Sequence, residues 1–369
     1  MKTKRKTSHR RNARSGYRHR SHSGRKKQWH KLWFIPLAIL LFALLVVGYA
    51  YRQVAYVPAV IGNDTTQLYV KDGFSLGDAF EQLAQKAMLR NPRIANRYIQ
   101  HRGRQIKIES GRYLLLPDMS MQEIANLLIS GGETSVSLTL RGLRTKQEVL
   151  QFFATYLAVT EEELDEALSN PALCRQLGGF DTENIRCLFL PGDYTFSWNV
   201  SVDELLDVMQ QRYRDFWTAE RRALADSLGL SPTQVAIIAS IVEEESQKSD
   251  EHARIARLYL NRFHRGMKLQ ADPTVKFATG RFDLRRITSE HLSVRSAYNT
   301  YREEGLPPGP IRLPRASTMD SVLHSHPSND LYMCAKEDFS GYHNFATTYT
   351  AHQANARKYQ AELNRRGIK

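Results

Sequence analysis

Cysteine is scarce in this chain, whose 369 residues contain only Cys174, Cys187 and Cys334. An odd number of widely spaced cysteines excludes a disulfide framework as the support of the fold, although a single Cys174–Cys187 bridge stays open. No cysteine lies in a metal-type spacing, and His324 and His326 have no carboxylate or thiol at ligand spacing. The sequence therefore predicts no metal site and no cofactor.

Acidic residues are absent from the first 31 positions, which carry thirteen lysines and arginines. Subtracting these thirteen charges from the net charge of +14 leaves +1 for the remainder of the chain. A nearly neutral remainder gives no reason to expect nucleic acid as a partner. We predict that residues 1–31 form a disordered basic arm that contacts anionic lipid headgroups or a cytoplasmic partner.

Charged residues are also absent from 32–50, the one long apolar run, and we predict a transmembrane helix over 32–51. Trp29 and Trp33 flank one end and Tyr49 and Tyr51 the other, as in an aromatic belt. The basic arm places residues 1–31 in the cytoplasm and the bulk of the chain outside the cytoplasmic membrane. A cleavable signal peptide is the alternative, but its basic and apolar regions would both be unusually long.

The remainder of the chain reads as a mixture of helices and strands, so the predicted fold class is α+β. Residues 52–72 read as a linker leading into a strand at 67–70. Residues 111–128 resemble residues 192–209 at a constant offset of 81, with Gly, Tyr, Ser and Glu at matching positions. This match predicts one strand–loop–helix unit that is used twice. A further strand is predicted at 136–140, and helices are predicted at 75–88, 92–102, 146–156, 161–169, 202–228 and 252–263.

A helix with an unusual acidic end is predicted over 231–246, SPTQVAIIASIVEEES. Ser231 and Gln234 form a capping box at its start, and Pro232 suits the first turn. At about 100° per residue, Glu245 falls into the apolar arc of the helix, Glu244 at its edge and Glu243 beyond its other edge. A carboxyl on a buried face has its charged form disfavoured, which raises its pKa towards that of a general acid.

The residues after this helix are rich in polar and aromatic side chains and read as long loops, where binding sites tend to lie. Each motif alone is weak, but their order and spacing are specific: Glu243-x-Glu245-Ser246, Asn261-Arg262, Gly266-Met267, Leu269-Gln270, Asp272-Pro273-Thr274-Val275, Ala297-Tyr298-Asn299-Thr300-Tyr301, Gly305-Leu306-Pro307-Pro308-Gly309, His343-x-Phe345 and His352. Together they resemble the endolytic murein transglycosylases of the MltG (YceG-like) family over about residues 60–365.

The resemblance implies a membrane anchor, a LysM-like subdomain at 52–132 and a catalytic domain at 133–369 in which a helical hairpin carries the catalytic glutamate. It also implies non-hydrolytic cleavage of the β-1,4 bond between N-acetylmuramic acid and N-acetylglucosamine inside glycan strands of peptidoglycan. The product would end in 1,6-anhydro-muramic acid, and the enzyme would serve as a terminator of glycan elongation. Peptidoglycan synthases are left open as partners.

The family's catalytic glutamate falls on Glu245, which the helical pattern also selects. Glu243 matches the family motif too and is the second choice, in a supporting role. We expect the cleft to be lined by polar and aromatic side chains suited to sugars; these substrate-binding candidates are Gln270, Asp272, Thr274, Tyr298, Asn299, Tyr301 and His343.

Two other functions compete with this interpretation. A non-catalytic peptidoglycan-binding scaffold would have no reason to keep an acid on an apolar helix face. A hydrolytic muramidase would use two carboxylates, with Asp272 as the second.

Overall fold

The computed structural model describes residues 26–284 and 286–367, with the backbone alone for residues 26–33. Residues 1–25, most of the predicted basic arm, lie outside the described residues. The described chain forms two compact units. The first consists of the residues up to Thr66 together with Leu76–Ile106 and Leu115–Leu127, and the second of Gln67–Ser75, Lys107–Leu114 and the chain from Leu128 onward.

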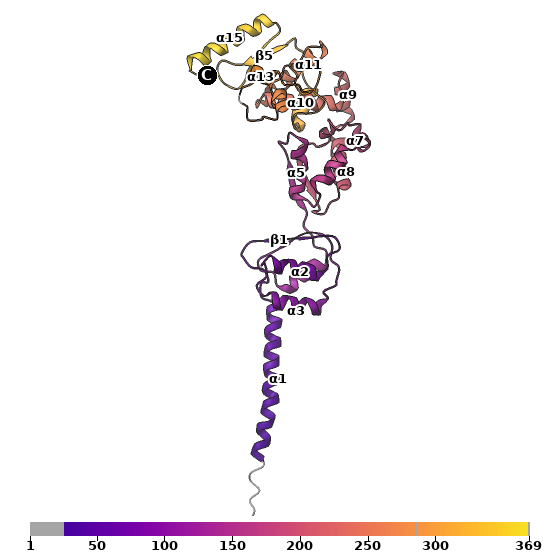
Figure 1. Cartoon of the computed structure of the whole chain (residues 1–369), viewed down its shortest axis with the longest axis vertical. Coiled ribbons are helices and arrows are strands. Elements are labelled where there is room, and N and C mark those ends of the chain that lie inside the picture. Colours follow the sequence, from indigo (N-terminus) through magenta and orange to yellow (C-terminus); the bar gives the residue numbers. More distant parts are fainter. Residues whose placement is uncertain (1–25, 285, 368–369) are drawn as a thin grey trace, which may run out of the picture. The chain divides into compact units, whose positions relative to one another are not determined.

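The first unit begins with α1 (Lys26–Ala55), a single long helix drawn in indigo in Figure 1. Its segment Phe34–Ala55 is long and apolar enough to cross a membrane, and it is not buried inside the unit. The helix takes in residues 26–31, which the sequence assigned to the arm. Helices α2 (Leu76–Gln85), α3 (Pro92–Arg102) and most of α4 (Met121–Ile129) complete this unit.

The strand predicted at 67–70 is present as Thr66–Val70, but the linker predicted before it is wrong. Pro58 forms an antiparallel bridge with Ser120, and Val60 forms another with Leu89. Both Ala59 and Val60 are buried. The chain therefore enters the first folded unit within three residues of the end of α1.

The second unit contains three two-stranded sheets in the part of the chain that the structure describes. Strand β1 (Thr66–Val70) pairs with β2 (Gly111–Leu115), β3 (Val136–Leu140) with β4 (Gly192–Phe196), and β5 (Tyr332–Ala335) with β6 (His343–Ala346). In β3, Val136, Leu138 and Leu140 are buried and the residues between them are exposed, as the alternating pattern requires. The mixed α+β class predicted from the sequence is confirmed.

Most of the regular structure of the second unit is helical, and several helices begin at capping boxes that the sequence displays. Thr145 with Glu148 starts α5 (Lys146–Tyr156), and Thr160 with Glu163 starts α6 (Glu161–Ser169). The remaining helices, with two short 3₁₀ turns η1 (Ile185–Leu188) and η2 (Ser249–Glu251), are α7 (Pro171–Gly178), α8 (Val202–Phe216), α9 (Ala219–Ser227), α10 (Pro232–Glu245), α11 (His252–His264), α12 (Asp272–Thr279), α13 (Ser289–Leu292), α14 (Ala316–Leu323) and α15 (Tyr349–Arg365).

The predicted repeat is present as β2–α4 and β4–α8. The hydroxyl of Tyr113 donates to the carbonyl of Glu109 at 2.8 Å, and Tyr194 makes the same contact with Leu190 at 2.5 Å. Capping boxes at Ser120 and Ser201 start the two helices in the same way. The four matching sequence positions therefore encode one local structure twice.

Three predicted element boundaries differ from the structure. The helix expected over 202–228 is two helices, because Thr218 caps a new helix after Trp217 ends α8. The region after residue 263 is rich in loops, as predicted, but it also contains the helices α12, α14 and α15. Asp272-Pro273 starts α12 because a proline at the first helical position has no amide hydrogen to leave unpaired.

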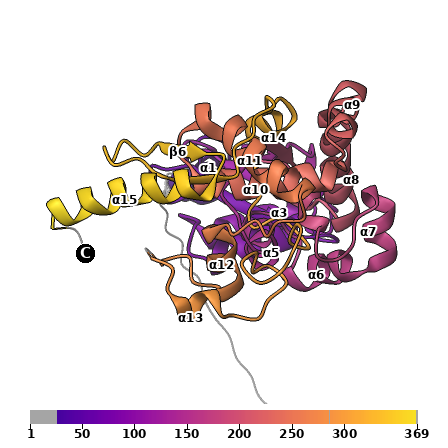
Figure 2. The same cartoon turned by 90° about the horizontal axis from the view of Figure 1, so that it is seen from above.

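Helix α10 lies within the second unit between α11 and α14, and Figure 2 shows these three close together. The side chains of α10 belong to one continuous apolar core that also includes β3, β4, α5 and α8. This position fixes the C-terminal end of α10, where the three glutamates lie. The fold thus holds the acidic end of α10 on a rigid support.

Candidate active site

Helix α10 is buried on every side, and not only along the predicted apolar arc. All residues from Val235 to Glu243 are buried, including Ser240. Glu243, at 2% exposed, is the most buried of the three glutamates. The inference that Glu245 alone shares a buried face is therefore wrong, because α11, α14 and the loop around Ile311 enclose the sides of α10 that the helical pattern left open.

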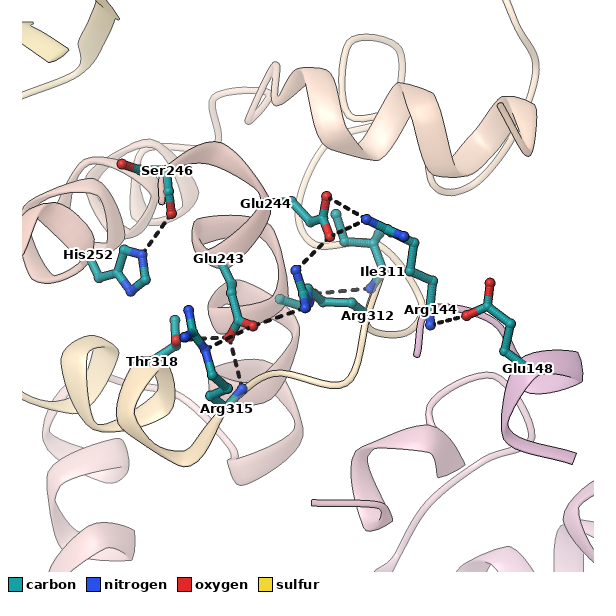
Figure 3. Close-up of polar contacts among 11 residues, drawn as sticks. Arg144, Glu148, Glu243, Glu244, Ser246, His252, Ile311, Arg312, Arg315 and Thr318 are labelled. Carbon is teal, nitrogen blue, oxygen red and sulfur yellow. Dashed lines mark hydrogen bonds and ion pairs between the residues drawn. The ribbon is translucent and has the colours of Figure 1, made fainter. Parts of the chain in front are cut away.

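Glu243 and Glu244 are held in ion pairs, as Figure 3 shows. Both carboxylate oxygens of Glu243 are bound: Oε1 lies 3.2 Å from Arg312 and 3.2 Å from Arg315, and Oε2 accepts from the Arg315 amide. Glu244 pairs with Arg312 at 2.8 Å and with Arg144 at 3.1 Å. These contacts tie the end of α10 to the 311–315 loop.

The hydroxyl of Thr318 completes the environment of Glu243 by donating to Oε2 at 2.9 Å. Glu243 thus accepts from an amide and a hydroxyl while pairing with two guanidinium groups. A carboxylate held by so many donors has no free lone pair directed at a substrate. The arrangement fits the supporting role proposed for Glu243.

Glu245 lies at the last position of α10 and faces a cavity. The hydroxyl of Tyr259, from α11, donates to its Oε1 at 2.6 Å. Although partly exposed to the cavity, the carboxyl is closely surrounded by protein, and this burial raises its pKa to about 7. The hydrogen bond from Tyr259 opposes the rise, and the nearby charge of Asp272 adds to it.

The cavity has a volume of about 410 Å³ and is lined by polar and aromatic side chains. Four predicted substrate-binding residues line it beside Glu245, namely Gln270, Asp272, Tyr301 and His343. The remaining residues around it are Leu258, Tyr259, Arg262, Leu269, Tyr332, Met333, Cys334, Ala335, Tyr349 and His352. The fold therefore brings together segments that lie up to about a hundred residues apart in the sequence.

Gln270 adopts a left-handed backbone with φ of 55°, which is rare for a residue other than glycine. Its side-chain oxygen accepts from Arg262, and its amide donates to the Thr300 carbonyl at 3.1 Å. Such strained positions concentrate at functional sites when the surrounding structure holds them in place. Here two hydrogen bonds hold Gln270 at the cavity wall.

Asp272 and His343 are each held by one neighbour. Asp272 accepts from the hydroxyl of Tyr301 at 2.6 Å. The Nδ1 atom of His343 lies 3.0 Å from Oε2 of Glu251, and the His343 amide donates to Oε1 of the same carboxylate at 3.0 Å. Both side chains are thus oriented by contacts that leave other atoms able to face the cavity.

Three predicted substrate-binding residues do not line the cavity. Thr274 and Asn299 are fully buried, at 0% exposed. Thr274 donates to the Ala271 carbonyl, and Asn299 donates to two carbonyls of the 292–294 turn. The hydroxyl of Tyr298 lies 3.1 Å from Arg186. The three side chains make contacts within and between loops instead of lining this cavity, and a role for them in substrate binding stays a prediction.

Tyr259, Tyr332, Tyr349 and His352 line the cavity but were not selected from the sequence as substrate-binding residues. Tyr332 stacks on His352 with ring centres 5.5 Å apart, and the Arg262 guanidinium lies over the Tyr332 ring at 5.6 Å. Tyr259 lies fourteen residues after Glu245 on the facing helix. A pattern of aromatic residues at the inner face of α11 was the only signal for it.

The three cysteines are free thiols in the structure. Cys174 and Cys187 are buried, and Cys174 donates to the Leu168 carbonyl instead of meeting its proposed partner. Burial raises the pKa of Cys334, which keeps this thiol in its protonated form. A thiol therefore does not compete with Glu245 for a chemical role in the cavity.

The model of one protein family, the YceG-like family, matches residues 68–358 of this chain. A protein of Bacillus subtilis named endolytic murein transglycosylase is 24% identical over 321 residues, which cover 81% of this chain and 86% of that protein. A protein of the same name from Streptococcus pneumoniae is 22% identical, and the match covers 82% of this chain but only 60% of the pneumococcal protein.

The fold is also similar to a crystal structure of a putative YceG-like protein from Listeria monocytogenes. The TM-score is 0.51 at 24% identity, and the match covers 79% of this chain and 99% of the other. The family match extends over most of the chain and includes α10 and every residue around the cavity. This protein belongs to the YceG-like family.

Proposed function

We propose that this protein is a membrane-anchored endolytic murein transglycosylase. The observation that carries the proposal is Glu245, a single carboxyl with a pKa raised to about 7 at the wall of a polar and aromatic cavity. The names of the similar Bacillus and Streptococcus proteins support the same activity. The bond cleaved would be the β-1,4 bond from N-acetylmuramic acid to N-acetylglucosamine within a glycan strand.

In this mechanism Glu245 acts twice. As an acid it protonates the glycosidic oxygen, and as a base it then accepts the proton of the muramyl 6-hydroxyl, which attacks the anomeric carbon. A pKa near neutral pH suits both halves, because the group must gain and lose a proton in each cycle. The product would end in 1,6-anhydro-muramic acid, with no water consumed.

The remaining cavity side chains suit a sugar substrate. Gln270, Tyr301 and His343 offer hydrogen-bonding groups for hydroxyl and N-acetyl groups, while Tyr332 and Tyr349 offer aromatic faces for the apolar faces of sugar rings. Asp272 lies close enough to raise the pKa of Glu245 and carries negative charge near the reacting centre. It would stabilise the positive charge that develops at the anomeric carbon.

The domain arrangement that goes with this function is a membrane helix, a LysM-like subdomain at 52–132 and a catalytic domain at 133–369. The apolar segment of α1 would anchor the protein in the cytoplasmic membrane, with the catalytic domain on the outer side, where peptidoglycan lies. An enzyme so placed would act on glycan strands near the membrane and terminate their elongation. Synthases that make those strands would be its natural partners.

Cleavage in ¹⁸O-labelled water separates this function from its closest rival. We expect the new muramyl end to carry no label, since the attacking oxygen is the sugar's own 6-hydroxyl. Mass spectrometry of the released fragments gives the answer directly. Label in the product would favour a hydrolytic muramidase instead, with Asp272 as the second carboxylate, because Asp272 shares the cavity with Glu245.

Substitution of Tyr259 by phenylalanine tests how the pKa of Glu245 is set. The Tyr259 hydroxyl lowers this pKa, so its removal should raise the pKa above about 7. Because Glu245 must be protonated to start the reaction, the loss of rate at alkaline pH should begin at a higher pH in Tyr259→Phe. Rates of glycan cleavage between pH 5 and pH 9 measure the shift, with Tyr342→Phe, which is bound to Asp250 away from the cavity, as the control. An unchanged or lower alkaline midpoint would contradict the role of Tyr259.

A further inference from the structure

The first unit contains a second cavity, of about 1020 Å³, between the last turns of α1 and helix α3. Its walls are mainly apolar, and cationic side chains of α3 lie among its lining residues. The residues that matter here are Val47, Ala50, Val54, Arg93, Arg97 and Tyr98. None of them belongs to the candidate active site.

The position of this cavity along α1 places it at a membrane surface. The segment Phe34–Ala55 has 22 residues. At about 1.5 Å per residue it is roughly as long as the hydrocarbon core of a bilayer is thick. With α1 as a membrane span, Val47 and Ala50 would lie among the acyl chains and Val54 close to the headgroups.

Helix α3 is held at this level by short connections to α1. The side-chain amide of Asn91, just before α3, donates to Gln53 in the last turn of α1 at 3.0 Å. The chain after α1 enters the folded unit at once, through the bridges from Pro58 to Ser120 and from Val60 to Leu89. The unit is thus not separated from the membrane by a free linker.

The charge on α3 has one sign. Its sequence PRIANRYIQHR contains three arginines and a histidine but no acidic residue. Arg93 and Arg97 are exposed and lie one helical turn apart at the cavity. Glu81, an acidic side chain of the neighbouring helix α2, is paired with Arg104 at 2.8 Å. Apolar walls within the bilayer and two arginines at headgroup level complement a lipid with a negative headgroup.

We propose that this cavity binds one anionic phospholipid, with an acyl chain against Val47 and Ala50 and its phosphate between Arg93 and Arg97. The inference rests on the part of the proposed function that makes α1 a membrane span. A lipid bound there fixes the first unit against the outer surface of the membrane. Arginine suits this task because its planar guanidinium binds phosphate oxygens in pairs.

The test compares lipids retained by the full-length protein after reconstitution in nanodiscs of equal parts phosphatidylglycerol and phosphatidylcholine with the same acyl chains. Native mass spectrometry counts the lipids that stay bound on release. We expect one phosphatidylglycerol to be retained in clear preference to phosphatidylcholine. Each arginine near an anionic headgroup strengthens binding about fivefold, so Arg93→Gln with Arg97→Gln should weaken the preference by about 25-fold.

Two controls separate this site from general charge and from helix changes. Arg175→Gln with Arg265→Gln removes the same charge from exposed positions of the second unit and should leave the preference unchanged. Ala50→Trp fills the cavity and should abolish retention of the lipid, while Ala43→Trp, on α1 but outside the cavity, should not. Equal retention of both lipids by the unaltered protein, or no effect of the Arg93 and Arg97 changes, would overturn the proposal.

Cleavage of purified glycan strands is measured on the same preparations. The Arg93 and Arg97 changes lie in the first unit, whereas α10 and the residues around Glu245 belong to the second, so cleavage of dissolved strands should be retained. Cleavage without selective lipid binding would overturn the lipid site alone. Selective lipid binding without cleavage in the unaltered protein would instead remove the proposed function and leave the lipid site standing.

Discussion

Glu245→Gln is expected to lower the rate of glycan cleavage by about 10²–10⁴-fold, which is the usual contribution of a general acid or base. The amide keeps the shape of the carboxyl and still accepts the hydrogen bond from Tyr259, but it cannot deliver or accept the proton. One group serves both halves of the reaction, so its loss removes both proton transfers. Cleavage of purified sacculi, followed by chromatography of the fragments, measures the loss.

The same substitution should stabilise the protein at alkaline pH. The pKa of Glu245 is raised from about 4.5 in the unfolded state to about 7 in the native state. The native state therefore binds the proton of this carboxyl more tightly than the unfolded state does. The native state therefore loses stability as the pH rises from 4.5 to 7, by at most about 3 kcal/mol since the carboxyl is partly exposed. Glutamine does not titrate, and Glu245→Gln should melt at a higher temperature than the unaltered protein at pH 8 but not at pH 4.

Glu244→Gln is the matched control for activity. Glu244 is the neighbouring carboxyl on α10, but its oxygens face Arg144 and Arg312 and it does not line the cavity. We therefore expect most of the cleavage rate to remain. Equal losses in Glu244→Gln and Glu245→Gln would show that charge at the end of α10, and not proton transfer by Glu245, limits the reaction.

Elements whose structure depends on contacts between nearby residues could be predicted from the sequence. Capping boxes such as Thr145 with Glu148 and Ser231 with Gln234 fix where helices begin, because the partners lie three residues apart. The repeat of Tyr113 and Tyr194 was visible for the same reason. Each tyrosine binds a carbonyl four residues earlier, so the contact needs no distant partner.

Contacts between distant segments decided the rest. In the 298–301 turn, Asn299 faces inward to bind the 292–294 carbonyls, while Tyr301 faces Asp272 in the cavity. From the sequence, both are polar or aromatic residues of a loop, and no local pattern predicts the direction of either side chain. Likewise, the apolar arc of α10 gave no sign that the 311–315 loop would bury Glu243, because Arg312 and Arg315 lie about seventy residues away.

Glu243→Ala is expected to produce the largest loss of stability among the changes considered. Glu243 is 2% exposed and neutralises Arg312, whose side chain is 17% exposed, and Arg315. Breaking a buried ion pair costs about 3–5 kcal/mol, and the loss here should lie near the lower end of that range because Arg312 keeps its pair with Glu244 and Arg315 is 55% exposed. The Thr318 hydroxyl and the Arg315 amide also lose their acceptor. For a unit of this size the melting temperature should fall by about 10 °C, as measured by circular dichroism.

Glu244→Ala is the control for stability, since Glu244 is 20% exposed and one of its partners, Arg144, is 34% exposed. Water screens such pairs, so its loss should lower stability by only about 1 kcal/mol. The milder Glu243→Gln separates support from chemistry, because it keeps the size of the side chain and one acceptor oxygen. We expect it to fall between the unaltered protein and Glu245→Gln in cleavage rate, with the loss following its stability. A well-folded but inactive Glu243→Gln beside an active Glu245→Gln would exchange the roles of the two glutamates.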